Sequence, residues 1–298
     1  MGNRIFLAAM FLIVLPGLGL ASAGDASFIF LRLGSGSRPA ALAEAVTASG
    51  ADITSAFYNP ALLKSFEGNN QAVFMYNSYF SDISQNYLSL AFKGKKSAVG
   101  GYLYLGRVAD MERRTGPDPQ PSGTFDENNF VGALTYSRGI SNYDFGFSLK
   151  YAYERIDSEA AHAVMFDFGL LIPLTDEIST GAAARNIGSK PKFIDTAFDL
   201  SREFRLGMAY KPKYFQQKVE LVADGVMYSD LDSKLNLGAE YKFPQYFALR
   251  AGYGIGWDSR GVSLGGGLYY RQFKFDYAFV GYKNDLGNAH RFTLIATF

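Results

Sequence analysis

The stretch Tyr-Asp-Phe-Gly-Phe-Ser-Leu-Lys-Tyr-Ala-Tyr-Glu, residues 143–154, decides the fold class of this chain. Every odd position in it is apolar or aromatic, and every even position is small or charged. Because successive side chains of a β-strand point to opposite faces, the stretch predicts a strand with one apolar and one polar face. The same two-residue rhythm returns, with Ile295 as its exception, in residues 234–243, 247–254, 273–279 and 291–298.

Two folds share this alternation, a soluble β-sandwich and an outer-membrane β-barrel. Sandwich strands typically run about 5–6 residues, whereas these segments run roughly 10–12, the length that crosses a bilayer at a tilt. Tyr and Phe stand at the ends of the apolar faces, as in the aromatic girdles of membrane barrels. The pattern therefore favours an all-β fold, a transmembrane antiparallel β-barrel whose apolar face meets lipid and whose polar face lines a lumen.

Counting the alternating segments predicts fourteen strands, an even number as in bacterial barrels. The connections alternate between short and long, and the longest are expected at residues 107–126 and 188–201. Short periplasmic turns and long outer loops are typical of such barrels, so the pattern places both chain ends in the periplasm. The expected strands cover residues 70–80, 85–93, 97–106, 127–138, 142–155, 160–172, 177–187, 202–211, 217–227, 233–243, 246–255, 261–271, 273–283 and 289–298.

The chain divides into three parts. Residues 1–23 combine a positive start, an uncharged apolar run and a small-residue end, which predicts a signal peptide cleaved after Ala23. A membrane-anchor helix is the weaker reading, because the apolar run is about half of the roughly 20 residues that a bilayer requires. Residues 24–68 are expected to form an N-terminal hatch, and residues 69–298 the barrel. Export combined with the barrel pattern predicts the outer membrane of a Gram-negative cell as the location.

The hatch prediction rests on residues 25–66, which show no sustained alternation. Pro39 and Pro60 cannot donate to a strand ladder. A periplasmic tail would be polar and disordered, but this segment is rich in Phe, Ile and Leu. A hatch folded into the lumen is therefore favoured over a tail, since larger barrels commonly carry a plug. The hatch residues of interest are Arg38, Pro39, Asp52, Asn59 and Pro60.

The inward faces of the predicted strands carry charges of both signs. Across hairpins, we expect Glu240 to lie beside Arg250, and Asp276 beside Arg291. Ion pairs that hold strand register are favoured over a ring that selects ions. Arg38 is expected to bind barrel carboxylates or carbonyls as a planar donor fork. The candidate lumen charges are Lys150, Asp167, Arg205, Glu240, Arg250, Asp276 and Arg291.

Glycines also recur on the inward face, and two interpretations of them stay open. They serve either the curvature that closes the barrel or the space that a hatch or ligand needs beside the wall. The glycines concerned are Gly238, Gly252, Gly254, Gly265 and Gly267.

The composition argues against several function classes. A formal net charge of +1 without a basic run argues against nucleic-acid binding. No cysteine and only two histidines leave no thiolate site and too few ligands for an ordinary zinc site. His162 and His290 are expected at outer strand ends on the lipid face, without a Ser or carboxylate placed to make either a base. We therefore predict no enzyme activity, no metal and no cofactor.

Several motifs resemble the PorV/PorQ family of outer-membrane proteins, which is related to FadL-type transporters of hydrophobic compounds. They are the run from Leu33-Gly34 to Arg38-Pro39-Ala40-Ala41, the run from Asp52 to Asn59-Pro60-Ala61, Leu237-Gly238-Ala239-Glu240-Tyr241, Leu249-Arg250-Ala251-Gly252-Tyr253, and the last strand from His290-Arg291 to Phe298. The resemblance covers essentially the whole mature chain. It implies a barrel of fourteen strands with an N-terminal hatch.

Two functions remain open. The resemblance to PorV implies an accessory of protein export that receives secreted cargo from a type IX translocon. The resemblance to FadL implies a conduit for hydrophobic small molecules. Either protein would have outer-membrane lipid as a partner. An export accessory needs an exposed apolar platform, whereas a conduit needs an apolar pocket. Within the predicted loop 190–200, Phe193, Ile194 and Phe198 are the candidates for a platform or a lid.

Overall fold

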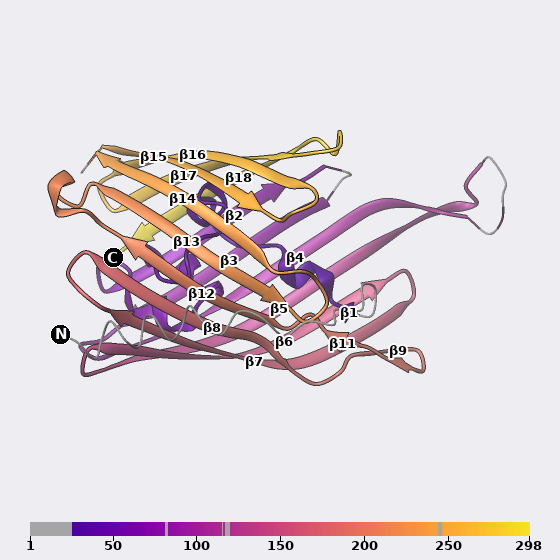
Figure 1. The fold of residues 1–298 in the computed structure, drawn as a ribbon. Coiled ribbons are helices and arrows are strands. Elements are labelled where there is room, and N and C mark those ends of the chain that lie inside the picture. The colour runs from indigo at the N-terminus through magenta and orange to yellow at the C-terminus, as the bar shows by residue number, and fades with distance from the viewer. Residues whose placement is uncertain (1–25, 81–82, 115, 117–119, 244–245) are drawn as a thin grey trace.

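The computed structural model describes residues 26–80, 83–114, 116, 120–243 and 246–298, and the predicted signal peptide lies outside this range. Its main element is a closed antiparallel barrel of fourteen strands in chain order, with the last strand hydrogen-bonded to the first (Figure 1). The predicted fold class and strand number are therefore confirmed. The wall strands are β2 (Asn70–Ser78), β3 (Ile83–Lys93), β4 (Ser97–Arg113), β5 (Gly123–Ile140), β6 (Tyr143–Ile156), β7 (Glu159–Pro173), β8 (Ile178–Gly188), β12 (Glu203–Tyr210), β13 (Val219–Tyr228), β14 (Lys234–Phe243), β15 (Phe247–Ile255), β16 (Arg260–Tyr270), β17 (Phe273–Tyr282) and β18 (Asn288–Thr297).

The two-residue rhythm divides each strand into an outer and an inner face. On β6, Phe147 and Leu149 are about two-fifths exposed, at 38% and 41%, whereas Ser148 and Lys150, which alternate with them, are buried. On the neighbouring strand, Leu134 also points outward and is exposed. The apolar rows thus form the outside of the barrel, and the polar rows line its interior.

One long loop of the prediction proves to be a hairpin. Strands β4 and β5 continue through most of residues 107–126 and resume their pairing at Met111–Phe125 after a register shift. Figure 1 shows this hairpin extending beyond the rest of the barrel. The alternation fades here because backbone pairing outside a bilayer needs no apolar face. The ion pair between Arg107 and Asp126, with 2.6 Å from Nη2 to Oδ2, joins the two strands of the extension.

The two ends of the described chain lie at opposite ends of the barrel. Strand β1 (Ala26–Ser27) pairs in parallel with β11 (Asp199–Leu200), which belongs to the long connection between β8 and β12. The last residue, Phe298, instead exchanges backbone hydrogen bonds with Asn70 at the end of the short turns (Figure 1). The prediction that both ends lie on one side is therefore wrong for the first described residues. The reason is that the chain passes through the lumen before β2 begins.

Residues 28–66, here called the inner segment, fill the interior between these ends. The segment contains four short helices, η1 (Ile29–Arg32), α2 (Ser37–Ala41), η2 (Ile53–Phe57) and η3 (Pro60–Lys64). Asp52 and Asn59 cap the last two, each accepting from the backbone N–H two residues on, and Pro60 occupies the first turn, where a missing N–H costs nothing. Within the described residues, no helix has the length and apolarity to cross a membrane.

Wall glycines let the backbone of the inner segment approach the barrel closely. A Cβ at Gly252 would lie 2.6 Å from the carbonyl carbon of Leu42, and one at Gly265 would lie 2.5 Å from the Cβ of Ala41. A Cβ at Gly238 would likewise meet the Leu42 carbonyl oxygen at 2.9 Å. These three glycines therefore provide space for the inner segment.

The remaining two glycines of the predicted set have other neighbours. Gly254 faces the Trp257 ring, and Gly267 faces the side chains of Arg250 and Asp276. Four further inward glycines, which the sequence did not single out, contact the inner segment at Thr47–Ala48 or Asn59–Ala61; they are Gly146, Gly169, Gly181 and Gly207.

A single methyl group tests this close approach. We expect Gly252→Ala to loosen the inner segment by about 1–3 kcal/mol, the usual cost of overpacking. Gly266→Ala on the neighbouring strand is the matched control, because a Cβ there meets only the Ala248 carbonyl oxygen, at 3.6 Å. The measurement is the rate of proteolysis within the inner segment in detergent-folded protein. Equal rates for the two variants would contradict the close approach.

Candidate functional site

Arg38 lies at the centre of the contacts between the inner segment and the wall. It projects from α2 and is 1% exposed. Its Nη2 donates to Glu240 Oε2 at 3.0 Å and to Glu220 Oε2 at 3.1 Å, and its Nη1 donates to the Ser49 carbonyl at 3.3 Å. The guanidinium thus joins strands β13 and β14 to the inner segment, as the planar fork of arginine allows.

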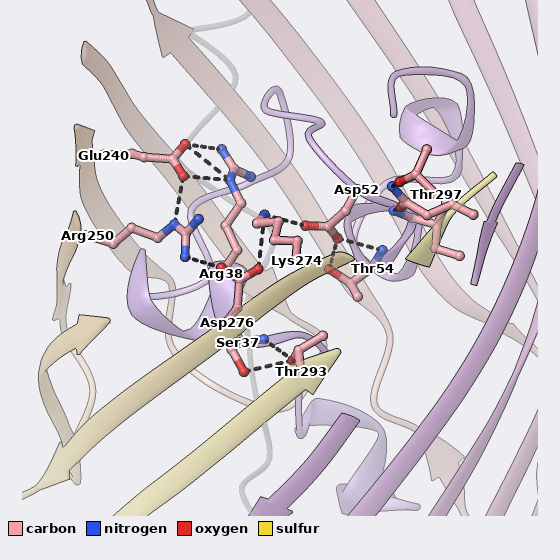
Figure 2. Close-up of polar contacts among 12 residues, drawn as sticks. Ser37, Arg38, Asp52, Thr54, Glu240, Arg250, Lys274, Asp276, Thr293 and Thr297 are labelled. Atoms are coloured by element: carbon pink, nitrogen blue, oxygen red, sulfur yellow. Dashed lines mark hydrogen bonds and ion pairs between the residues drawn. The ribbon is translucent and has the colours of Figure 1, made fainter. Parts of the chain in front are cut away.

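The charges continue from Arg38 through three wall strands and return to the inner segment (Figure 2). Glu240 accepts from Arg250 Nε at 2.7 Å, and the two residues are direct cross-strand partners, as the sequence predicts. Arg250 Nη1 lies 2.7 Å from Asp276 Oδ1, and Asp276 pairs with Lys274 at 3.0 Å. Lys274 Nζ finally lies 3.6 Å from Asp52 Oδ2. Two residues of the inner segment are therefore connected through the barrel wall by alternating charges.

The expected neighbours Asp276 and Arg291 do not pair. Asp276 lies opposite Thr293 in the register of β17 and β18, and Arg291 lies opposite Ala278. The guanidinium of Arg291 donates instead to the Gly36 carbonyl at 3.2 Å and to the Tyr79 hydroxyl at 2.9 Å. The prediction failed because the hairpin is centred one residue later in the chain than the prediction assumed, which offsets the cross-strand partners by two residues.

A second group of charges, on β8, β12 and β13, also contacts the inner segment. Arg205 donates from Nε to Thr47 Oγ1 at 2.9 Å, and its Nη atoms lie 2.7 Å from Glu203 and 3.1 Å from Asp224. Arg185 pairs with the same Glu203 at 2.7 Å, and its guanidinium stacks 4.4 Å above the Phe57 ring.

Lys150 and Asp167 form a 2.6 Å pair beside the second group. Arg185, Glu203 and Asp224 were not among the predicted lumen charges, although they occupy inward positions of their strands. On strand β8, a bulge near Asn186, whose φ is +60°, interrupts the alternation of inward and outward side chains. The sequence pattern therefore does not show that Arg185 points inward.

The Asn59-Pro60 motif attaches the C-terminal part of the inner segment to the wall. Asn59 is fully buried, and its Nδ2 donates to the Thr47 carbonyl at 2.7 Å and to the wall carbonyl of Leu170 at 3.1 Å. Pro60 starts η3, and Pro39 occupies the first turn of α2 behind Arg38. All five hatch residues named from the sequence are therefore buried in the interior.

The predicted loop platform is only partly exposed. Phe193 and Phe198 are half-buried and pack edge to face with ring centroids 6.3 Å apart. Phe193 also packs on Phe28 of the inner segment at 6.4 Å. Ile194 alone projects outward and is 72% exposed. Phe193 thus covers the start of the inner segment and Phe198 packs on Phe193, an arrangement that fits a lid better than an exposed platform.

The histidines lie on the outer face. His162 is exposed beside the Tyr151 ring, and His290 Nδ1 lies 2.8 Å from the Tyr277 hydroxyl. Among the described residues, no three His, Cys, Asp or Glu side chains gather as a metal-binding group.

Two carboxylates of the inner segment are stabilised in their charged form. Burial by itself raises the pKa of Glu44. The positive charges of Arg260, Arg291 and Arg205 lower this pKa by more than burial raises it, so the net pKa is below the usual 4.5. Arg260 is in direct contact, with 2.9 Å from its Nη1 to Glu44 Oε2. Burial likewise raises the pKa of Asp52, and Lys274 then lowers it to below its usual value. Both groups therefore favour the folded contacts at neutral pH.

Several solved structures share this fold. The TodX deltaS2S3 mutant monoaromatic hydrocarbon channel superposes with a TM-score of 0.67 at 15% identity, covering 89% of this chain and 99% of that one. The CymD monoaromatic hydrocarbon channel superposes with 0.67 at 12% identity, covering 89% and 98%. A Pseudomonas aeruginosa FadL homologue superposes with 0.56 at 11% identity, covering 88% and 97%. No family model matches the chain, and no curated protein does.

Arg38→Ala tests the electrostatic tether. We expect the variant to weaken the attachment of the inner segment by about 3–5 kcal/mol, because removing one partner leaves buried carboxylates uncompensated. Proteolysis of the inner segment and single-channel conductance in a planar bilayer should both rise. Arg271→Ala is the matched control, since Arg271 is exposed on a short turn. Unchanged conductance and unchanged protease resistance would contradict a tether.

The depressed pKa values predict a pH dependence. A carboxylate with a lowered folded-state pKa stabilises the fold above its unfolded pKa, and this stabilisation is lost as the pH falls through the folded value. Protease resistance of the inner segment should therefore hold at neutral pH and begin to fall only below the ordinary Glu value of 4.5. Glu44→Gln should reduce the slope of this loss. A loss centred near neutral pH would contradict the assignment.

Proposed function

We propose that this chain is an outer-membrane barrel that admits hydrophobic small molecules through a lumen gated by the inner segment. The observation that carries the proposal is a continuous apolar cluster inside the barrel. It begins at Phe28 and Phe30, near the long connections, and continues through Phe57 to Phe66 beside Lys93 at a short turn. A lumen for hydrophilic solutes would be polar and water-filled.

Aromatic rings form much of this cluster. Phe30 stacks on Tyr104 of β4 with centroids 5.8 Å apart, and Phe57 packs on Tyr102 at 5.7 Å. Tyr102 also lies 5.2 Å from Tyr87 of β3. Rings prefer such offset and edge contacts with one another, so this wall would suit a monoaromatic or aliphatic guest better than a polar one.

The outer face supports the membrane location. Large apolar side chains cover it, and Leu134, Leu249 and Phe292 are each more than half exposed. In water such a surface would be an aggregation hazard, whereas lipid would cover it. The channels with the same fold are named for monoaromatic hydrocarbons, which favours the conduit over the export accessory that the PorV/PorQ resemblance implies. The half-buried Phe193 and Phe198 also leave only Ile194 as a platform for cargo.

A disulfide can test whether passage requires the inner segment to move. Ser37 Oγ on α2 lies 2.7 Å from Thr293 Oγ1 on β18, and the chain contains no cysteine of its own. In Gram-negative cells that express the Ser37→Cys/Thr293→Cys variant, we expect uptake of radiolabelled toluene to fall to the vector level on oxidation. Reduction should restore the uptake. The two single-cysteine variants are the controls and should be insensitive to the oxidant.

The outcomes separate the candidate functions. If cells that express the wild-type chain take up no more toluene than cells that carry the empty vector, the proposal of a conduit for hydrophobic molecules is contradicted. Uptake that persists in the oxidised double variant would contradict gating by the inner segment. A secreted protein that co-purifies with the wild-type chain, without toluene uptake, would instead favour the export accessory.

A further inference from the structure

Two carboxylates lie side by side on the inner face of the β5–β6 hairpin. Glu154 is 6% exposed and is the direct cross-strand partner of Asn129, and Glu127 lies two residues from Asn129 on the same face. The Glu154 carboxyl interacts with the Glu127 carboxyl and with the backbone of Phe28 in the inner segment. The pair stands near the end of the barrel that carries the long connections.

This pair differs from the other inward carboxylates in having no cationic partner. Asp167, Glu203 and Glu240 each lie within 2.7 Å of a Lys or Arg nitrogen. Across the described part of the chain, by contrast, no ion pair includes Glu127 or Glu154. A buried carboxylate next to a second, half-buried one is costly without a counter-charge, so the arrangement favours a positively charged ligand.

Unpartnered oxygen atoms beside the pair point to the same conclusion. Asn129 is 6% exposed, and its Nδ2 donates to Glu127 Oε1 at 2.8 Å, which directs its side chain into the cluster. Its Oδ1 is buried without a hydrogen-bond partner, and so is the hydroxyl of Tyr104, which is 2% exposed. Gly106 stands between them, because a Cβ there would lie 3.2 Å from the Tyr104 hydroxyl and 3.4 Å from the Asn129 Cβ.

We propose that Glu127, Asn129 and Glu154 form a binding site for a hard divalent cation, with Ca²⁺ as the best match. Carboxylate and amide oxygens are the donors that Ca²⁺ prefers, and water completes its shell of six to eight oxygens. Nitrogen and sulfur donors, which transition metals favour, are missing from this set. The site uses two carboxylates and an amide, a combination that the sequence analysis did not consider when it predicted no metal.

The site also has a structural consequence for the inner segment. Glu154 interacts with the backbone of Phe28, and Phe30 stacks on Tyr104 with ring centroids 5.8 Å apart. A cation bound between the carboxylates would remove their repulsion and hold the start of the inner segment against β4–β6. Ca²⁺ binding is independent of the proposed transport function, because it requires no passage through the lumen.

Terbium luminescence tests the proposal, since Tb³⁺ replaces Ca²⁺ and Tyr104 is placed to sensitise it. With detergent-folded full chain, we expect one saturable Tb³⁺ site that Ca²⁺ displaces. Glu154→Gln and Glu127→Gln should each weaken binding by about tenfold or more, as loss of a ligand would. Asp157→Asn is the matched control, because Asp157 is half-exposed on the turn that follows β6 and pairs with Arg113 at 2.7 Å. Its affinity should equal that of the wild type.

Thermal unfolding gives a second readout that separates loss of the site from loss of the fold. Ca²⁺ should raise the unfolding temperature of the wild type and of Asp157→Asn but not of Glu154→Gln. Without Ca²⁺, Glu154→Gln should be at least as stable as the wild type, because the variant relieves the repulsion. Equal Tb³⁺ titrations for wild type and Glu154→Gln, or an equal Ca²⁺ shift in both, would overturn the proposal.

Discussion

Closure of the sheet is the constraint on which the rest of this structure depends. The last strand pairs with the first from His290–Ser78 to Thr297–Gln71, so no wall strand is left with an unpaired edge. In hydrocarbon every unsatisfied backbone group costs several kcal/mol, and only a closed sheet satisfies all of them with strands. Closure in turn divides the side chains into an outer set that faces lipid and an inner set that must be satisfied within a confined space.

The inner segment and the wall are chemically complementary for that reason. The wall carries Glu240 and Arg260 at inward positions, and the inner segment supplies Arg38 and Glu44 as their partners. Removal of the segment would leave Arg260 without Glu44 and would deprive Glu240 of one of its two arginine partners. The same ion pairs therefore hold the segment inside the barrel and make its displacement costly, while the apolar cluster beside them packs its aromatic side chains against the wall.

Much of the fold follows from local rules that the sequence displays directly. Alternation such as that in residues 143–154 indicates that the segment is a strand, which of its side chains share a face, and how long the strand is, because the side-chain period of a strand is two. The sequence also predicts which residues pair across two strands joined by a tight turn, as it does for Glu240 and Arg250. The rule fails where turn length shifts the register, as for Asp276 and Arg291. It also fails at the extended β4–β5 hairpin, where pairing continues without an apolar face.

The sequence by itself determined a fourteen-stranded barrel with charges on its inner face and apolar rows on its outer face, because each of these features depends on neighbours along the chain or across one hairpin. Only the tertiary structure decided which charges meet across the lumen, since contacts such as Arg38 with Glu220 join residues 182 positions apart. It alone decided that Gly252 makes room for Leu42, and that the backbone of Phe28 meets Glu154. Such contacts depend on the path of the inner segment, and no periodic pattern in the sequence encodes that path.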